Sequence, residues 1–173
     1  MELDTALEQI RTWCDESKGT KIELLPGEDA VFESRSLHSS QELSAVEKAI
    51  EFTFPDSYRR FMNTIGASSL FSLSTYGGGP RFYTPEEVIK ASEGATYRDD
   101  EGQVHRFCFV GEHLCMGDFM GFLTSKPDSR NFDVFCHEYP FEEYVAVSNE
   151  IDSWRTFEQW LIRSVESRGE DTL

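Results

Sequence analysis

LSAVEKAIEFTFPDSYRRFMNTIGASS, residues 43–69, is the stretch that decides the fold, because it contains two short amphipathic helices separated by a Phe-Pro step. In the first helix, Leu43, Val46 and Ile50 recur at i, i+3 and i+7 and form one apolar stripe. The segment Ser39–Glu42 ahead of them has the spacing of a capping box. The pattern therefore predicts a helix that begins near residue 40 and faces a core.

The second helix of this stretch has a recognisable beginning, apolar face and end. Pro55 favours extended geometry in the residue before it and suits the first helical position, where its missing N–H has no cost. The apolar face repeats at Tyr58, Phe61, Met62 and Ile65. Gly66 follows at the position where a left-handed helix cap favours glycine.

The rest of the chain alternates between helix and strand patterns. Further helices are predicted at residues 3–17, 84–91 and 150–167. Strand candidates are residues 21–25, 30–33, 70–74, 81–83, 106–110, 120–124, 132–136 and 144–148. Asn149 is expected to cap the last helix, with Ile151 and Trp154 on its apolar side.

These elements predict the α+β fold class. Strands that follow one another closely after residue 105 favour an antiparallel or mixed sheet of about six strands. Helices at both ends would pack on one face or edge of that sheet. The length of 173 residues fits a single domain, which we expect to span residues 1–168, with residues 169–173 as a frayed tail.

The stretch at residues 43–69 resembles the SUKH superfamily, also called the Smi/Knr family, and the resemblance extends from about residue 40 to residue 162. It continues through Phe82–Glu87, the glycine-bearing segment 109–118 and a closing helix at 148–161. The resemblance implies a structural role for six residues: Pro55, Tyr58, Phe61, Gly66, Gly117 and Trp154. One turn departs from the family pattern, because Ile65 stands where the family usually has Asn before the glycine.

The composition excludes several classes of function. A net charge of -16 repels phosphate backbones, and no basic patch is visible, so direct nucleic-acid binding is not expected. The acidic N-terminus and the short apolar runs predict neither a signal peptide nor a membrane span, which favours a cytoplasmic location. The four cysteines, at positions 14, 108, 115 and 136, lack a C-x-x-C pair, which favours reduced thiols over disulfides.

Acidic residues gather in three blocks around a nearly neutral middle. Residues 1–51 carry a net charge of -7, residues 86–118 of -5 and residues 138–173 of -6. This acidity either serves solubility alone or attracts a cationic partner.

The candidate sites for chemistry are weak. The glycine-rich turn Tyr76–Pro80 lacks the Lys-Ser/Thr of a phosphate-binding loop. Two soft ligands at His113 and Cys115, with Cys136 and His137 from a neighbouring strand, form a conceivable metal site, although adjacent residues of a strand point to opposite faces. No nucleophile elbow occurs, and consecutive acids cannot act as a catalytic pair within a strand. We therefore expect no catalytic residues, no metal and no cofactor.

Recognition is the remaining chemistry, because carboxylates interleaved with aromatic residues suit an interface that both steers and anchors a partner. The candidate partner-binding residues are Asp99, Asp100, Glu101, Glu112, Asp118, Glu138, Tyr139, Glu142 and Glu143. Ordinary solvated loops are the alternative explanation for each of them.

What the resemblance implies is a bacterial immunity protein, a stoichiometric inhibitor of a cognate, contact-delivered toxin domain, with a basic nuclease-type toxin as the expected partner. The first alternative is a regulatory adaptor like the fungal members of the family. The second is a metal-dependent enzyme using His113, Cys115 and His137. The sequence leaves the oligomeric state open.

Overall fold

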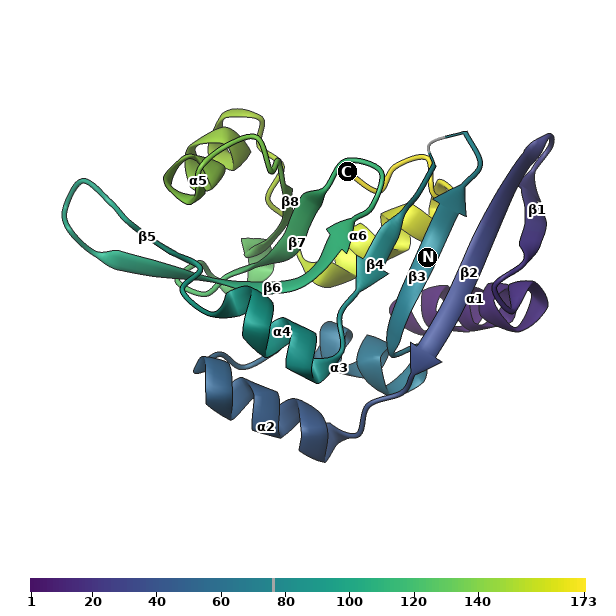
Figure 1. Cartoon of the computed structure of the whole chain (residues 1–173), viewed down its shortest axis with the longest axis horizontal. Helices are drawn as coiled ribbons and strands as arrows, with labels where there is room; N and C mark the ends of the chain where they lie inside the picture. Colours follow the sequence, from purple (N-terminus) through teal and green to yellow (C-terminus); the bar gives the residue numbers. More distant parts are fainter. Residues whose placement is uncertain (76) are drawn as a thin grey trace.

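The computed structural model describes residues 1–75 and 77–173 and shows an antiparallel sheet with helices packed around it (Figure 1). The strands pair in the order β1-β2-β3-β4-β6-β7-β8, and β5 pairs with β6 beside this path. Their bounds are β1 Lys21–Leu25, β2 Glu28–Ser36, β3 Ala67–Leu73, β4 Pro80–Phe82, β5 Thr96–Arg98, β6 Val104–His113, β7 Asp118–Leu123 and β8 Phe132–Phe135. The described strands number eight, rather than the expected six, and every pairing among them is antiparallel.

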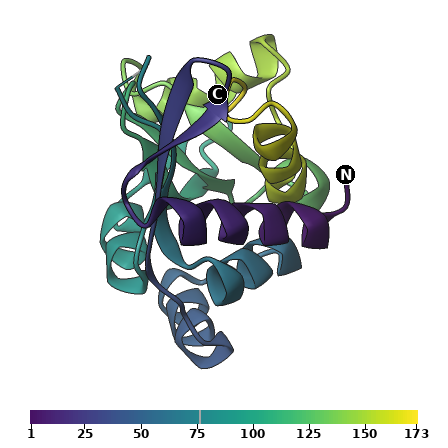
Figure 2. The same ribbon diagram turned by 90° about the vertical axis from the view of Figure 1, so that its right-hand side faces the viewer.

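Six α-helices are present in the described part of the chain. They are α1 Leu3–Ser17, α2 Ser40–Ile50, α3 Asp56–Thr64, α4 Pro85–Ser92, α5 Phe141–Glu150 and α6 Phe157–Glu166. Helices α1, α3 and α6 lie together on one side of the sheet (Figure 2). Helix α4 packs against β6 and α2, and α5 packs against β5 and β8.

The first core lies between the sheet and the helices α3 and α6. The Phe61 ring lies 4.5 Å from that of Phe82 on β4, and Phe157 lies 5.2 Å from Tyr58. Trp160 of α6 packs on the same Phe82 ring at 5.6 Å. All five side chains are fully buried, including Tyr58 and Phe61.

The Phe-Pro step is held by one carboxylate. Glu47 of α2 accepts a hydrogen bond from the Phe54 backbone N–H at 2.8 Å and another from Arg59 Nε at 2.9 Å. Pro55 stands directly before α3, at its N-cap position. These contacts fix α3 relative to α2 and direct the aromatic face of α3 toward the sheet.

A second aromatic core lies on the opposite face of the sheet, under α5. In β8, Phe132 contacts Phe157 of α6, whereas Phe135 stacks on Tyr144 of α5 at 5.2 Å. Because alternate residues of a strand point to opposite faces, Phe132 and Phe135 face different cores. Phe107 lies on the α5 side, 5.7 Å from Tyr144.

Residues 144–148 form part of helix α5, so the predicted strand there is wrong. Valines at 145 and 147 favour strands, but tertiary packing overrides that preference. Phe141, Tyr144 and Ser148 share the helix face that turns toward the sheet, with Tyr144 and Ser148 buried. Residues that the sequence predicted to form a strand are therefore part of a helix that packs on the sheet.

The last helix begins at Phe157 rather than at residue 150, and Asn149 does not cap it. Thr156 and Gln159 form its capping box, a signal that the sequence contains six residues after the expected start. Ile151 is 67% exposed and not part of an apolar face. Trp154 is buried outside any helix, where its indole N–H donates to Asn149 Oδ1 at 2.9 Å.

The C-terminal residues are packed instead of frayed. The Trp160 indole N–H donates to the carbonyl oxygen of Thr172 at 3.1 Å, and Thr172 is 6% exposed. The Gly169 N–H donates to the Ser164 carbonyl at 2.9 Å. The chain beyond α6 thus folds back over the end of that helix.

Gly66, at the end of α3, offers a test of this packing. Its φ is +77°, and a Cβ atom at this position would lie 1.8 Å from the carbonyl oxygen of Ser36. Gly66→Ala should therefore lower the free energy of unfolding by the left-handed strain of about 1–2 kcal/mol plus at least about 2 kcal/mol of overpacking. Urea denaturation measures the loss.

Gly27→Ala is the matched control, since Gly27 has a φ of +78° and a Cβ atom added there would meet no heavy atom within 4 Å. This variant should lose only the left-handed strain. Equal losses in the two variants would contradict the close approach of Gly66 to β2.

Candidate functional site

The hairpin between β5 and β6 carries three of the predicted site residues, and its turn is organised by one of them, Asp99. The Asp99 Oδ1 atom accepts hydrogen bonds from the backbone N–H groups of Glu101 at 3.0 Å and Gln103 at 2.8 Å. The other carboxylate oxygen lies 2.8 Å from His105 Nε2. Asp99 therefore shapes the turn instead of being free to contact a partner.

His105 fixes Asp99 from the neighbouring strand. Its Nδ1 atom lies 2.7 Å from Ser125 Oγ, and the Tyr97 ring stacks on it at 4.8 Å between centroids. The pKa of the Asp99 carboxyl is lowered, chiefly by the hydrogen bond with His105 and further by the backbone N–H groups. The carboxylate form is thus the one that stabilises the hairpin.

Asp100 and Glu101 are exposed at the tip of this hairpin, as predicted for an interaction site. Helix α5 packs against β5, so the tip and α5 lie at the same end of the molecule (Figure 1). Glu142 and Glu143 are exposed in the first turn of α5. Two elements that are distant in the sequence thus present carboxylates at one end of the sheet.

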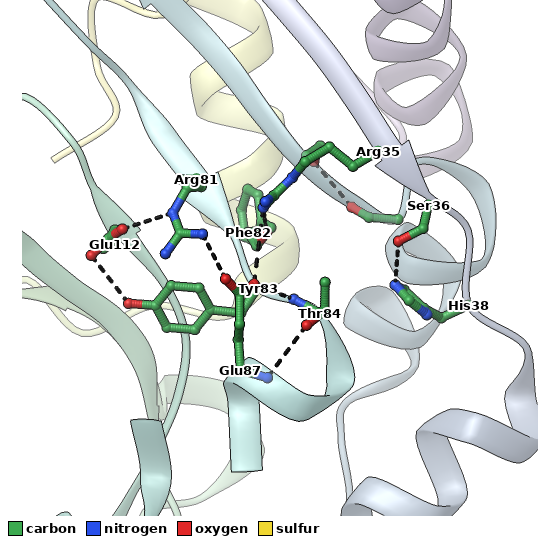
Figure 3. Close-up of polar contacts among 11 residues, drawn as sticks. Arg35, Ser36, His38, Arg81, Phe82, Tyr83, Thr84, Glu87 and Glu112 are labelled. Atoms are coloured by element: carbon green, nitrogen blue, oxygen red, sulfur yellow. Dashed lines mark hydrogen bonds and ion pairs between the residues drawn. The ribbon is translucent and has the colours of Figure 1, made fainter. Parts of the chain in front are cut away.

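Glu112 belongs to a different, internal arrangement. Figure 3 shows its carboxylate between Arg81 and Tyr83 on the sheet: the Arg81 Nε–H donates to it at 2.7 Å and the Tyr83 hydroxyl at 3.3 Å. Arg81 also donates to Glu87 of α4 at 2.8 Å, and its guanidinium lies 4.9 Å from the Tyr83 ring centre. Burial raises the pKa of Tyr83, with a further contribution from Glu112, so the hydroxyl keeps its proton and donates to Glu112.

The Arg81 network joins β4, β6 and α4, and sequence reasoning missed it. Burial lowers the pKa of Arg81, but the hydrogen bonds to Glu87 and Glu112 outweigh this effect and raise it. Arg35 adds a second cation, donating to the Phe82 carbonyl oxygen at 3.1 Å (Figure 3). No local pattern relates Arg81 to Glu112, because 31 positions separate them.

Asp118 is buried and supports the adjacent loop. Its Oδ1 atom accepts a hydrogen bond from the His137 backbone N–H at 3.0 Å and lies 2.9 Å from His137 Nδ1. Gly117, just before it, has a φ of +78°, and a Cβ atom added there would lie 3.7 Å from the His137 ring. With an exposed fraction of 7%, Asp118 is placed to hold two loops together rather than to contact a partner directly.

Glu138 and Tyr139 are exposed in the loop between β8 and α5. The Tyr139 side chain is 41% exposed. Of the nine predicted partner-binding residues, six are exposed: Asp100, Glu101, Glu138, Tyr139, Glu142 and Glu143. The other three, Asp99, Glu112 and Asp118, make internal contacts.

The residues considered for a metal site do not assemble into one. The His113 Nε2 atom lies 3.0 Å from Thr172 Oγ1, and His137 Nδ1 faces Asp118. Among residues 1–75 and 77–173, no three His, Cys, Asp or Glu side chains are grouped so that they could hold a metal ion. The four cysteines form no disulfide, and burial raises the pKa of Cys14 to about 11.

The glycine-rich turn connects two neighbouring strands. Gly77–Pro80 lead from β3 into β4, while Tyr76, the first residue of the predicted turn, lies outside the described residues. Within the described chain, no helix has both the length and the apolar character that crossing a membrane would require.

The fold and its surface thus define a small α+β domain, in which six of the predicted site residues, five carboxylates and Tyr139, are exposed. The model of the SMI1 / KNR4 family (SUKH-1) matches residues 38–163, and the chain belongs to this family. This match confirms the resemblance that the sequence shows.

A comparison with curated proteins adds a relative along nearly the whole chain. Immunity protein RhsIB of Dickeya dadantii (strain 3937) is 23% identical over 165 residues, which cover 95% of this chain and 96% of that protein. No solved structure gives a significant match.

The Asp99 turn provides a test of the hairpin. Replacing Asp99 with Ala removes the acceptor of two backbone N–H groups, so amide hydrogen exchange at Glu101 and Gln103 should accelerate by about tenfold or more. Asp100→Ala, at the neighbouring exposed position, is the control and should leave both exchange rates unchanged.

The same contacts predict a pH dependence. Because the folded-state pKa of Asp99 is lowered, its stabilising contribution is present above the unfolded pKa of about 3.9 and is lost as the pH falls through the folded value. Protection of the hairpin amides should decrease in that acidic range in the wild type and not in Asp99→Ala. Identical acid profiles would argue against the role of Asp99.

Proposed function

We propose that this chain is an immunity protein that binds a cognate toxin domain in the cytoplasm and neutralises it as a stoichiometric inhibitor, without catalysis. The similarity to Immunity protein RhsIB carries the proposal, because it extends over 95% of this chain and 96% of that protein. Membership of the SMI1 / KNR4 family over residues 38–163 supports it.

The surface supports a basic partner. Asp100 and Glu101 at the hairpin tip, with Glu142 and Glu143 of the adjacent α5, are exposed carboxylates at one end of the molecule. A net charge of -16 adds a long-range field of the same sign. Toxins that act on nucleic acid need positive charge where they meet phosphates, so a nuclease-type toxin domain fits this surface.

The internal contacts support a binding role over an enzymatic one. Asp99 and Asp118, the acids with the most hydrogen bonds in the two candidate loops, accept bonds from backbone N–H groups and face histidines. Their hydrogen-bonding capacity is used to shape the loops. The loops are consequently preformed for recognition, which lowers the entropy cost of binding.

Co-expression tests the function directly. Cells that express the toxin domain encoded beside the gene for this chain should grow when the chain is also produced, and a one-to-one complex should be recovered from them. The proposal would be overturned if the toxin domain still killed cells that contain the folded chain. It would also be overturned if the cells survived but no complex of the two proteins could be recovered.

Electrostatic steering predicts a dependence of association on salt. The association rate constant should fall by about tenfold or more between low and physiological salt, because opposite charges accelerate encounter. The double substitution Asp100→Lys/Glu101→Lys should reduce the low-salt rate constant and flatten its salt dependence. Stopped-flow mixing with an active-site-silenced toxin domain measures both.

Asp15→Lys/Glu16→Lys is the matched control, since it makes the same change in net charge at two exposed positions of α1, far from β5 (Figure 1). It should lower the rate constant much less than the hairpin variant. Equal effects would show that net charge matters and that the hairpin does not.

A further inference from the structure

The turn between β6 and β7 meets two other segments at one edge of the sheet. The His113 Nε2 atom, at the start of the turn, lies 3.0 Å from Thr172 Oγ1 in the C-terminal segment. At the other end of the turn, Asp118 Oδ1 accepts a hydrogen bond from the His137 N–H of the β8–α5 loop at 3.0 Å. These contacts bring residues 113–117, the 137–139 loop and residues 171–173 together at this edge.

This region holds a large share of the exposed apolar side chains. Nine large apolar side chains are exposed in the described chain, and four of them belong to the three segments: Leu114, Met116, Tyr139 and Leu173. Their exposed fractions are 47%, 46%, 41% and 51%. Scattered apolar residues are ordinary on protein surfaces, but a local concentration marks an interaction site. We refer to these four residues as the hairpin patch.

Hydrogen bonds fix the backbone of the β6–β7 turn, which carries Leu114 and Met116 of the hairpin patch. The Leu114 N–H donates to the Gly79 carbonyl oxygen at 3.0 Å, and the Gly117 N–H closes the turn on His113 at 2.7 Å. Asp118 fastens the turn to the His137 loop. A fixed turn loses little conformational freedom on binding, so its apolar side chains can contribute most of their burial energy to affinity.

Exposed carboxylates are close neighbours of two hairpin-patch residues along the chain. Glu138 lies next to Tyr139, Glu142 and Glu143 follow in the first turn of α5, and Glu170 precedes the C-terminal segment; all four are exposed. An apolar centre with a charged rim is the usual anatomy of a protein interface. The charge of the rim requires a partner with basic groups around its own apolar depression.

We propose that the hairpin patch is the anchor by which this protein holds its toxin partner, with Leu114 and Met116 inserting into an apolar depression ringed by basic side chains. The proposal rests on the proposed function and specifies its contact surface. Glu112 and Asp118, expected from the sequence to contact the partner, instead hold the hairpin whose tip does so. The acidic β5–β6 tip accelerates encounter, whereas the hairpin patch determines how long the complex lasts.

The test compares substitutions of one type inside and outside the hairpin patch. Leu114→Asp and Met116→Asp should each raise the Kd for an active-site-silenced toxin domain, encoded beside the gene for this chain, by at least about 30-fold. The increase should lie in the dissociation rate constant and persist at high salt. Leu37→Asp is the matched control, because Leu37 is 61% exposed and follows β2, away from the hairpin patch. It should change the Kd less than about threefold.

Two further measurements separate the outcomes. Thermal unfolding should give similar midpoints for all variants, and the milder Leu114→Ala should still weaken binding by several-fold if Leu114→Asp proves less stable. Sedimentation should show a monomeric wild type; a dimer that Leu114→Asp dissociates would assign the hairpin patch to a second copy and overturn the proposal.

The binding measurements also separate a failure of the proposed contact surface from a failure of the proposed immunity function. Wild-type binding with unchanged affinity in both Asp variants would overturn the hairpin patch and leave the immunity function standing. Absence of wild-type binding to the toxin domain would overturn both.

Discussion

Aromatic side chains on both faces of one sheet are the constraint on which this structure depends. Phe122 and Phe132 point toward α6, while Phe107 and Phe135 point toward α5. A sheet with such residues on both faces has to be covered on both, because each exposed ring would lose several kcal/mol of burial, of the order of 25 cal/mol per Å². The helices occupy the two faces, and the loops at the ends of the strands remain exposed.

At these loops, some carboxylates make internal hydrogen bonds and others are exposed to solvent. Asp99 and Asp118 each tie a loop to a histidine and to backbone N–H groups. Asp100, which follows Asp99, is exposed to solvent, and so is Glu138, which follows His137. Fixed loops with free charges at their tips give a surface that is both ordered and strongly negative. Such a surface favours fast encounter with a basic partner and a small entropy cost on docking.

Local signals allowed much of the fold to be predicted from the sequence. The capping box at Ser39 is present, the predicted apolar face of α3 is buried, and in α2 Leu43 and Val46 are buried while Ile50 is partly so. The prediction failed at residues 144–148, where valine-rich composition favours a strand and packing on Phe107 produces a helix. The strand β5 is only three residues long and lacks a distinct apolar alternation, so local spacing does not reveal it.

The candidate site could be predicted in chemistry but not in role. Acidic and aromatic residues between the predicted elements were identifiable from the sequence, whereas the partners that commit Asp118 and Glu112 to internal contacts lie 19 and 31 positions away. Long-range contacts of this kind leave no trace in local spacing. They determine which carboxylates remain available at the surface.

The C-terminal segment has a practical consequence for how the protein is handled. Thr172 is hydrogen-bonded through its carbonyl oxygen to Trp160 and lies beside His113, so Leu173 lies next to the β6–β7 turn. An affinity tag or fluorescent fusion appended there would begin against that turn and could shield it from any docking molecule. The N-terminal ammonium group, which pairs with Glu166 at 2.8 Å, is the safer attachment point at the cost of one exposed ion pair.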